Sequence, residues 1–123
     1  MEFEIGGHTY RANRMDARSQ FHITRRLAPV FGELAPAMKG GAMDAIAPLA
    51  NAIAKLSDAD VDYILFGLLR SVSRKQPQGL GWAPVAVGDV IMFDDITMPQ
   101  MIQIAWRALA YNLQDFFAEL PSG

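Results

Sequence analysis

The chain contains no cysteine and only two histidines, His8 and His22, among its 123 residues. Disulfide-stapled extracellular scaffolds are therefore excluded, and zinc sites built from clustered Cys and His are not expected. A chain of this length buries about two thirds of its surface on folding, so it needs no covalent staple to form a core. We expect one globular domain over residues 1–123, without a metal ion or another cofactor.

Long apolar runs are also absent, although 51% of the residues are hydrophobic. No stretch reaches the roughly 18 consecutive apolar residues of a membrane-spanning helix. The residues Met1 to Glu4 lack the basic and then apolar pattern of a signal peptide. The net charge of −2 provides no general attraction for phosphates. The sequence thus predicts a soluble intracellular protein that binds neither membranes nor nucleic acids.

Signatures of catalysis are missing too: there is no Walker phosphate loop, Rossmann glycine pattern, nucleophile elbow or Cys–His pair. Asp58, Asp60 and Asp62 imitate the start of a calcium loop. The sixth position of that loop, however, is Tyr63 instead of glycine, and the twelfth is Leu69 instead of glutamate. We therefore expect a protein that is not an enzyme.

Charge is distributed unevenly along the chain. Residues 1–30 hold five arginines and three acids, whereas residues 81–123 hold one arginine and five acids. The favoured interpretation is that the two ends lie near one another in the fold, and the alternative is head-to-tail self-association. Arg18, Arg25 and Arg26 are available for phosphate contacts, but they form no clear recognition-helix arrangement, which favours a solvated helix face.

Two segments have the pattern of a β-hairpin. Apolar and polar residues alternate in residues 3–11 around Gly6-Gly7, and residues 82–93 flank the turn dipeptide Gly88-Asp89. Pro84 favours an edge strand. We expect the two hairpins to form a small antiparallel sheet of about four strands. The polar residues 73–81, with one proline and two glycines, are expected to form a loop.

The first two predicted helices follow from apolar residues spaced by three or four. The first begins after its N-cap Asp16, and Pro29 and Pro36 should kink or split it. The second covers residues 43–54, with Pro48 in its first turn. The core-facing residues predicted for the first helix are Ala17, Phe21, Leu27 or Ala28, Phe31, Leu34 and Met38.

The last two predicted helices begin at capping boxes. One starts after Ser57 and carries apolar residues through Val72; the other starts at Thr97, with Gln100 three residues later, and runs to about Leu120. The sequence therefore predicts an α+β fold that is mainly α-helical, with a small antiparallel sheet made of two hairpins.

Several apolar side chains exceed what the core requires. Tyr63 and Phe66 project from the third helix on the side opposite its apolar stripe. The last helix is apolar around most of its circumference, so it either lies at the centre of the fold or is covered by a partner. Three methionines fall within residues 92–101, and methionine adapts to varied apolar partners. The predicted partner-binding residues are Tyr63, Phe66, Met98, Met101, Trp106, Phe116 and Phe117.

Two stretches, residues 3–34 and residues 82–117, carry distinctive runs. They are Gln20-Phe21-His22 with Arg25-Arg26-Leu27-Ala28-Pro29, and Trp82-Ala83-Pro84 with Met92-Phe93-Asp94-Asp95-Ile96. In this order the stretches resemble a family of small bacteriophage and prophage proteins described as tail assembly chaperones. The resemblance implies a non-enzymatic role in the host bacterial cytoplasm, in which the chaperone shields the hydrophobic helices of the tape measure protein before the tail tube polymerises. It implies no catalytic or cofactor-binding residues.

Two other functions remain open at this point. The same apolar surface could close a permanent homo-oligomer, as in a structural component of the tail. The arginines between Arg18 and Arg26 could also serve a small DNA-binding regulator, which would retain duplex DNA at moderate salt.

Overall fold

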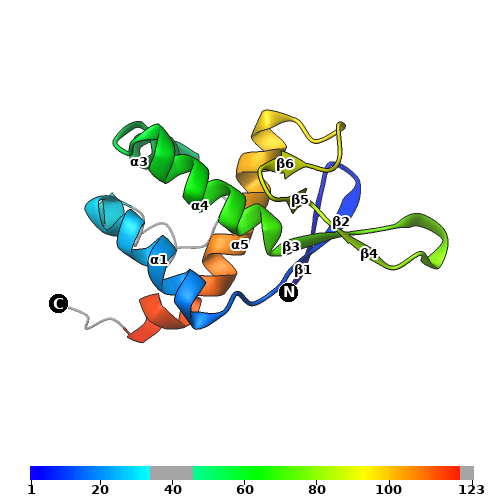
Figure 1. Ribbon diagram of the computed structural model, residues 1–123, viewed down its shortest axis with the longest axis horizontal. Helices are drawn as coiled ribbons and strands as arrows, with labels where there is room; N and C mark the ends of the chain where they lie inside the picture. Colours follow the sequence, from blue (N-terminus) through cyan, green and yellow to red (C-terminus); the bar gives the residue numbers. More distant parts are fainter. Residues whose placement is uncertain (34–45, 120–123) are drawn as a thin grey trace.

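The computed structural model describes residues 1–33 and 46–119, with side chains described for residues 1–33 and 50–114 (Figure 1). Helices and a small antiparallel sheet share one hydrophobic core, which confirms the predicted α+β class. The helices are α1 (Ala17–Leu27), α3 (Ile46–Ala54), α4 (Asp58–Arg70) and α5 (Met98–Glu119), with the 3₁₀ turns η1 (Ala28–Val30) and η3 (Pro77–Gly79). The strands are β1 (Glu2–Ile5), β2 (His8–Ala12), β3 (Val72–Lys75), β4 (Trp82–Pro84), β5 (Ala86–Val87) and β6 (Val90–Ile91).

The main sheet has the strand order β1-β2-β3-β4, and every neighbouring pair is antiparallel. The first predicted hairpin is confirmed as β1 and β2. The prediction of a loop over residues 73–81 is wrong at its start, because β3 pairs with both β2 and β4. Val72 and Arg74 point into the core while Lys75 is exposed, so this strand has a buried arginine at a position where apolar residues are usual.

The second predicted hairpin is also present, but only part of it joins the main sheet. Strands β5 and β6 form a separate two-stranded sheet around a turn in which Gly88 has a positive φ of 58°. Strand β4, which precedes them, lies at the edge of the main sheet, so Pro84 occupies the edge position that its missing N–H favours.

Helix α1 starts as predicted, but the side that it turns to the core agrees only in part with the prediction. The carboxylate of Asp16 accepts a hydrogen bond from the Ser19 backbone N–H at 3.2 Å. The α-helix ends at Leu27 and continues as the 3₁₀ turn η1 at Pro29, so the predicted interruption is confirmed there. Pro36 lies outside the described residues. Leu27 is buried as predicted, together with Ile23 and Val30, whereas Ala17 and Phe21, also predicted to face the core, are exposed, Phe21 to 61%. Phe31 packs against the core as predicted, and Leu34 and Met38 lie outside the described residues.

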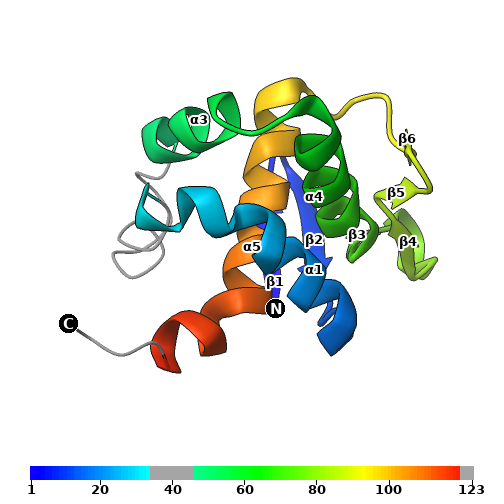
Figure 2. The same ribbon diagram turned by 60° about the vertical axis from the view of Figure 1, so that its left-hand side comes forward.

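Helix α5 lies at the centre of the fold. Its capping box is formed, since the Thr97 N–H donates to Gln100 Oε1 at 3.0 Å and the Gln100 N–H donates to Thr97 Oγ1 at 3.3 Å. The helix packs against α4 on one side and against β1 and β2 on another, and Figure 2 shows it running through the middle of the molecule. Ile104 and Ala108 are fully buried, while Met98 in the first turn is 68% exposed. The middle of the helix is therefore enclosed by the chain itself, as the first alternative predicts, whereas its start is exposed.

Hydrogen bonds between Arg74 on β3 and Asp95 link the segment before α5 to the main sheet. Arg74 is only 8% exposed, and its Nη1 and Nη2 atoms donate to the two carboxylate oxygens of Asp95 at 2.7 and 2.9 Å. The same guanidinium lies 2.9 Å from His8 Nε2 and 4.3 Å from the centre of the Phe93 ring. The hydrogen bonds from Arg74 lower the pKa of Asp95 from 3.8 to about 2.

This network makes the stability of the fold depend on pH. Because the pKa of Asp95 is lower in the folded chain, the stability it contributes is complete above about pH 4 and is lost as the pH falls toward 2. We expect Asp95→Asn to lower the Tm by a few degrees at pH 7 and to flatten the fall of the Tm between pH 5 and 2. Circular dichroism measures both effects, with Asp94→Asn as the neighbouring control. An unchanged acid dependence in Asp95→Asn would contradict this role.

Candidate functional site

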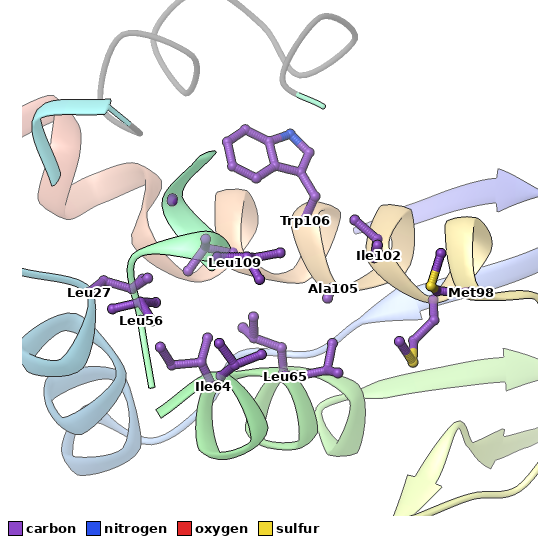
Figure 3. A pocket seen from close by; sticks show the side chains of 14 residues that line it. Leu27, Leu56, Ile64, Leu65, Met98, Ile102, Ala105, Trp106 and Leu109 are labelled. Atoms are coloured by element: carbon purple, nitrogen blue, oxygen red, sulfur yellow. The ribbon is translucent and has the colours of Figure 1, made fainter. Parts of the chain in front are cut away.

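An apolar groove of about 210 Å³ lies between α3, α4 and α5, with the end of α1 also contributing to its wall. Figure 3 shows Leu27 and Leu56 toward one end of the groove and Met98 toward the other. All of the lining residues are apolar: Leu27, Ala52, Ile53, Leu56, Val61, Ile64, Leu65, Leu68, Met98, Met101, Ile102, Ala105, Trp106 and Leu109.

The groove is formed where two apolar stripes face one another. Helix α4 begins after Ser57, whose side-chain oxygen accepts a hydrogen bond from the Asp60 N–H at 3.1 Å. Val61, Ile64, Leu65 and Leu68 follow at helical spacing, so their side chains share one side of α4 and face the groove. The first three turns of α5 present the opposite wall, and the residues around α3 close the third side.

The groove has a buried floor and an open mouth. Ile64, Leu68 and Leu109 are at most 7% exposed and belong to the core. Leu65, Met101 and Ile102, which share the lining with them, are only half-buried. Side chains of this kind attract an apolar ligand, because each fully buried aliphatic side chain contributes about 1.5–3 kcal/mol. Among the described residues the lining has no acid, base or hydroxyl, so this arrangement suits apolar binding.

Three of the predicted partner-binding residues line the groove: Met98, Met101 and Trp106. Met98 is exposed and Met101 half-buried, whereas Trp106 is 5% exposed and forms part of the wall. The side chains of Phe116 and Phe117 lie outside the described residues.

The other two predicted residues, Tyr63 and Phe66, are on α4 away from the groove. Tyr63 is 38% exposed, and the Arg26 guanidinium lies 3.9 Å from its ring centre. Phe66 packs against the core, so the prediction that both aromatics face outward is wrong for Phe66. The sequence alone did not identify Ile53, on the short alanine-rich helix, or Leu56, which follows it, because the pattern of this segment gives no sign of facing a groove.

The sequence of the chain matches a known protein family. A family model described as phage tail assembly chaperone protein, TAC, matches residues 6–123. The chain belongs to this family of tail assembly chaperones. The match confirms the resemblance of the two outer stretches and extends it through residues 35–81, between them. Comparisons with curated proteins and with solved structures found no match.

Membership of the tail assembly chaperone family implies that this chain interacts with other tail proteins during assembly in the host cell, and it points to a non-enzymatic role. Within the described residues, no three His, Asp or Glu side chains gather as ligands for a metal ion. No helix there has both the length and the hydropathy needed to cross a bilayer.

The mouth of the chaperone's groove has an acidic edge. Asp58 and Asp62 are exposed, and they precede Leu65 by seven and three residues, so they lie on the same side of α4 as this groove residue. Asp60, in contrast, is turned toward α1, where Arg26 Nη1 donates to its carboxylate at 2.6 Å. The groove therefore combines an apolar lining with negative charge along one rim.

Proposed function

We propose that this chaperone binds the hydrophobic helices of the tape measure protein in the groove between α3, α4 and α5, in the cytoplasm of the host bacterium. Binding shields these helices until the tail tube polymerises around the tape measure protein. The observation that carries the proposal is the groove itself, whose lining is apolar throughout and whose mouth is open.

The size of the groove suits reversible binding. An amphipathic helix laid along it would insert side chains from about three successive turns. Three or four such side chains, at about 2 kcal/mol each, give a gross stabilisation of about 6–8 kcal/mol. Association alone costs about 4–15 kcal/mol, so one groove holds one helix only weakly. Weak binding repeated along a long tape measure protein lets the chaperone leave when the tube subunits arrive.

Two features of the groove widen the range of helices that fit. Met98 and Met101 are flexible and polarizable, and they can repack around different apolar side chains. Asp58 and Asp62 at the rim favour helices with Lys or Arg beside the apolar stripe. The long sequence of a tape measure protein can therefore be bound at many places with one kind of site.

Co-expression tests the proposal. The tape measure protein of the same phage should be insoluble when expressed alone, and it should be soluble and co-purify when this chain is present. Equal solubility with and without the chain, together with no co-purification, would show that the proposal is wrong. Light scattering over a wide concentration range identifies the competing role, because a permanent homo-oligomer built on the groove keeps its mass on dilution.

A further inference from the structure

Helix α1 carries a second surface, separate from the groove. Arg18, Phe21, His22 and Arg25 have the spacing i, i+3, i+4 and i+7, which places them on one side of the helix; we call these four residues the α1 face. The opposite side holds the buried Ile23 and is packed against α4. Figure 1 shows α1 at the margin of the molecule, where its outer side has no other element of the described chain over it.

An aromatic ring stands at the centre of the α1 face. Phe21 is 61% exposed, far more than the core residues Ile23 and Leu27 of the same helix. The imidazole of His22 meets the Phe21 ring edge-on, with ring centres 5.5 Å apart and an interplanar angle of 65°. The two rings thus pack against each other at the surface. A large exposed apolar group is suited to contact with a partner.

The charges on the α1 face are not neutralised within the described residues. Arg11, Arg26, Arg70 and Arg74 each form an ion pair with an acid. Arg18 and Arg25 are exposed, and their guanidinium groups make no ion pair or hydrogen bond in the described part of the chain. Helix α1 itself contains no acid. Unpaired positive charge is therefore concentrated on both sides of the exposed phenylalanine.

We propose that the α1 face binds an acidic helical segment of a partner protein. Arg18 and Arg25 are seven residues apart, which separates them by roughly 10 Å along the helix. Two carboxylates with the same i, i+7 spacing on a partner helix can each take a bidentate guanidinium. An apolar side chain between them, at i+3 or i+4, packs against Phe21. This surface would make the chaperone a two-sided adaptor, with one apolar groove and one cationic face.

Nucleic acid fits the α1 face less well. Proteins that bind duplex DNA through its backbone commonly make about 6–10 phosphate contacts. The α1 face has two unpaired arginines, and Arg26, which completed the basic cluster in the sequence, is engaged by Asp60. The whole chain has a net charge of −2, which repels a polyanion away from this face.

Two helical peptides of about 20 residues test the α1 face, since shorter helices form poorly in water. They share one apolar stripe, and one carries Glu at positions i and i+7 where the other carries Lys. With the groove blocked by Ile102→Glu, the Glu peptide should at low salt bind the chain at least about tenfold more tightly than the Lys peptide. The double variant Arg18→Glu with Arg25→Glu should reverse this preference, which a merely structural role for the arginines would not do.

Matched variants separate the α1 face from the groove. Phe21→Ala should weaken the Glu peptide by about tenfold, because it removes the apolar contact. Lys75→Glu, an exposed cation on β3, is the charge control and should leave binding unchanged. Ile102→Glu, which blocks the groove, should also leave it unchanged. Equal binding of the two peptides, loss of binding in Ile102→Glu, or tighter binding of a 20-base-pair duplex would each overturn the proposal.

Discussion

Replacing Ile102 with glutamate is expected to abolish co-purification of the tape measure protein. Ile102 lines the groove and is half-buried, so the free chaperone should tolerate the longer polar side chain. In the complex, the substitution removes an apolar contact of about 1.5–3 kcal/mol. It also leaves a charge without a partner in an apolar interface, which costs at least about 1–3 kcal/mol. Together these effects correspond to a loss of affinity of about 100-fold or more.

A matched control makes the Ile102→Glu result specific. Leu80 is 76% exposed in the turn after η3 and does not line the groove, so Leu80→Glu makes a similar apolar-to-acidic change elsewhere. We expect Leu80→Glu to bind like the native chain. The affinity of both variants can be measured by titrating a purified apolar helix of the tape measure protein, with thermal unfolding as the check on folding. Native affinity in Ile102→Glu, or equal losses in both variants, would argue against the groove.

The second large effect is expected at Asn112, a buried polar residue on α5 that is 5% exposed. Its Oδ1 accepts hydrogen bonds from the Met15 N–H at 2.7 Å and from Gln20 Nε2 at 3.2 Å. Its Nδ2 donates to the Asn13 carbonyl at 3.3 Å and to the Ala108 carbonyl at 2.9 Å. The Asn112 side chain thus joins α5 to the β2–α1 connection and to α1, both of which lie far from α5 in the sequence.

Asn112→Leu should therefore destabilise the chain by about 2–4 kcal/mol. The substitution leaves the Met15 N–H and the Asn13 carbonyl without the partner they have in the native chain, and each such group costs about 1–3 kcal/mol. The favourable burial of leucine offsets only part of this loss. Urea unfolding followed by circular dichroism measures the change. Gln114→Leu, at an exposed position of the same helix, is the control and should change stability by less than about 0.5 kcal/mol.

A native unfolding midpoint for Asn112→Leu would show that the network is not needed for the position of α5. Binding of an apolar helix in the groove is a second measurement on the same variant. Because α5 forms one wall of the groove, a chain that folds with α5 displaced should also bind the apolar helix less tightly. Unchanged stability together with unchanged binding would show that Asn112 does not position the α5 wall of the groove.

Helix starts could be predicted from sequence because the signals are local. Asp16, Ser57 and the Thr97–Gln100 box each act within one turn, and the structure forms all three caps. The face that a helix buries is less local. In α1 the apolar residues on the side of Phe21 and those on the side of Ile23 recur with the same helical period. Only the packing of α1 against α4 decides that the side with Ile23 is buried.

Strand β3 and the groove could not be predicted for a different reason. Arg74 can occupy an inward position only because Asp95, 21 residues later, neutralises its charge. The apolar stripes of α4 and α5 were both predicted, but the space between them depends on where α3 lies. Residues such as Leu56 become part of a site only through that arrangement. The family resemblance supplied the function that neither periodicity nor composition could.

Site-specific photo-cross-linking tests the binding of the tape measure protein in the groove most directly. A photoreactive phenylalanine derivative would replace Met98, which lines the mouth of the groove and is 68% exposed, or Leu80, which is equally accessible but lies elsewhere. Each variant would be irradiated in cells that also express the tape measure protein. Groove binding predicts that position 98 cross-links to apolar helices of the tape measure protein and that position 80 does not. Cross-linking from position 80 without any from position 98 would contradict it.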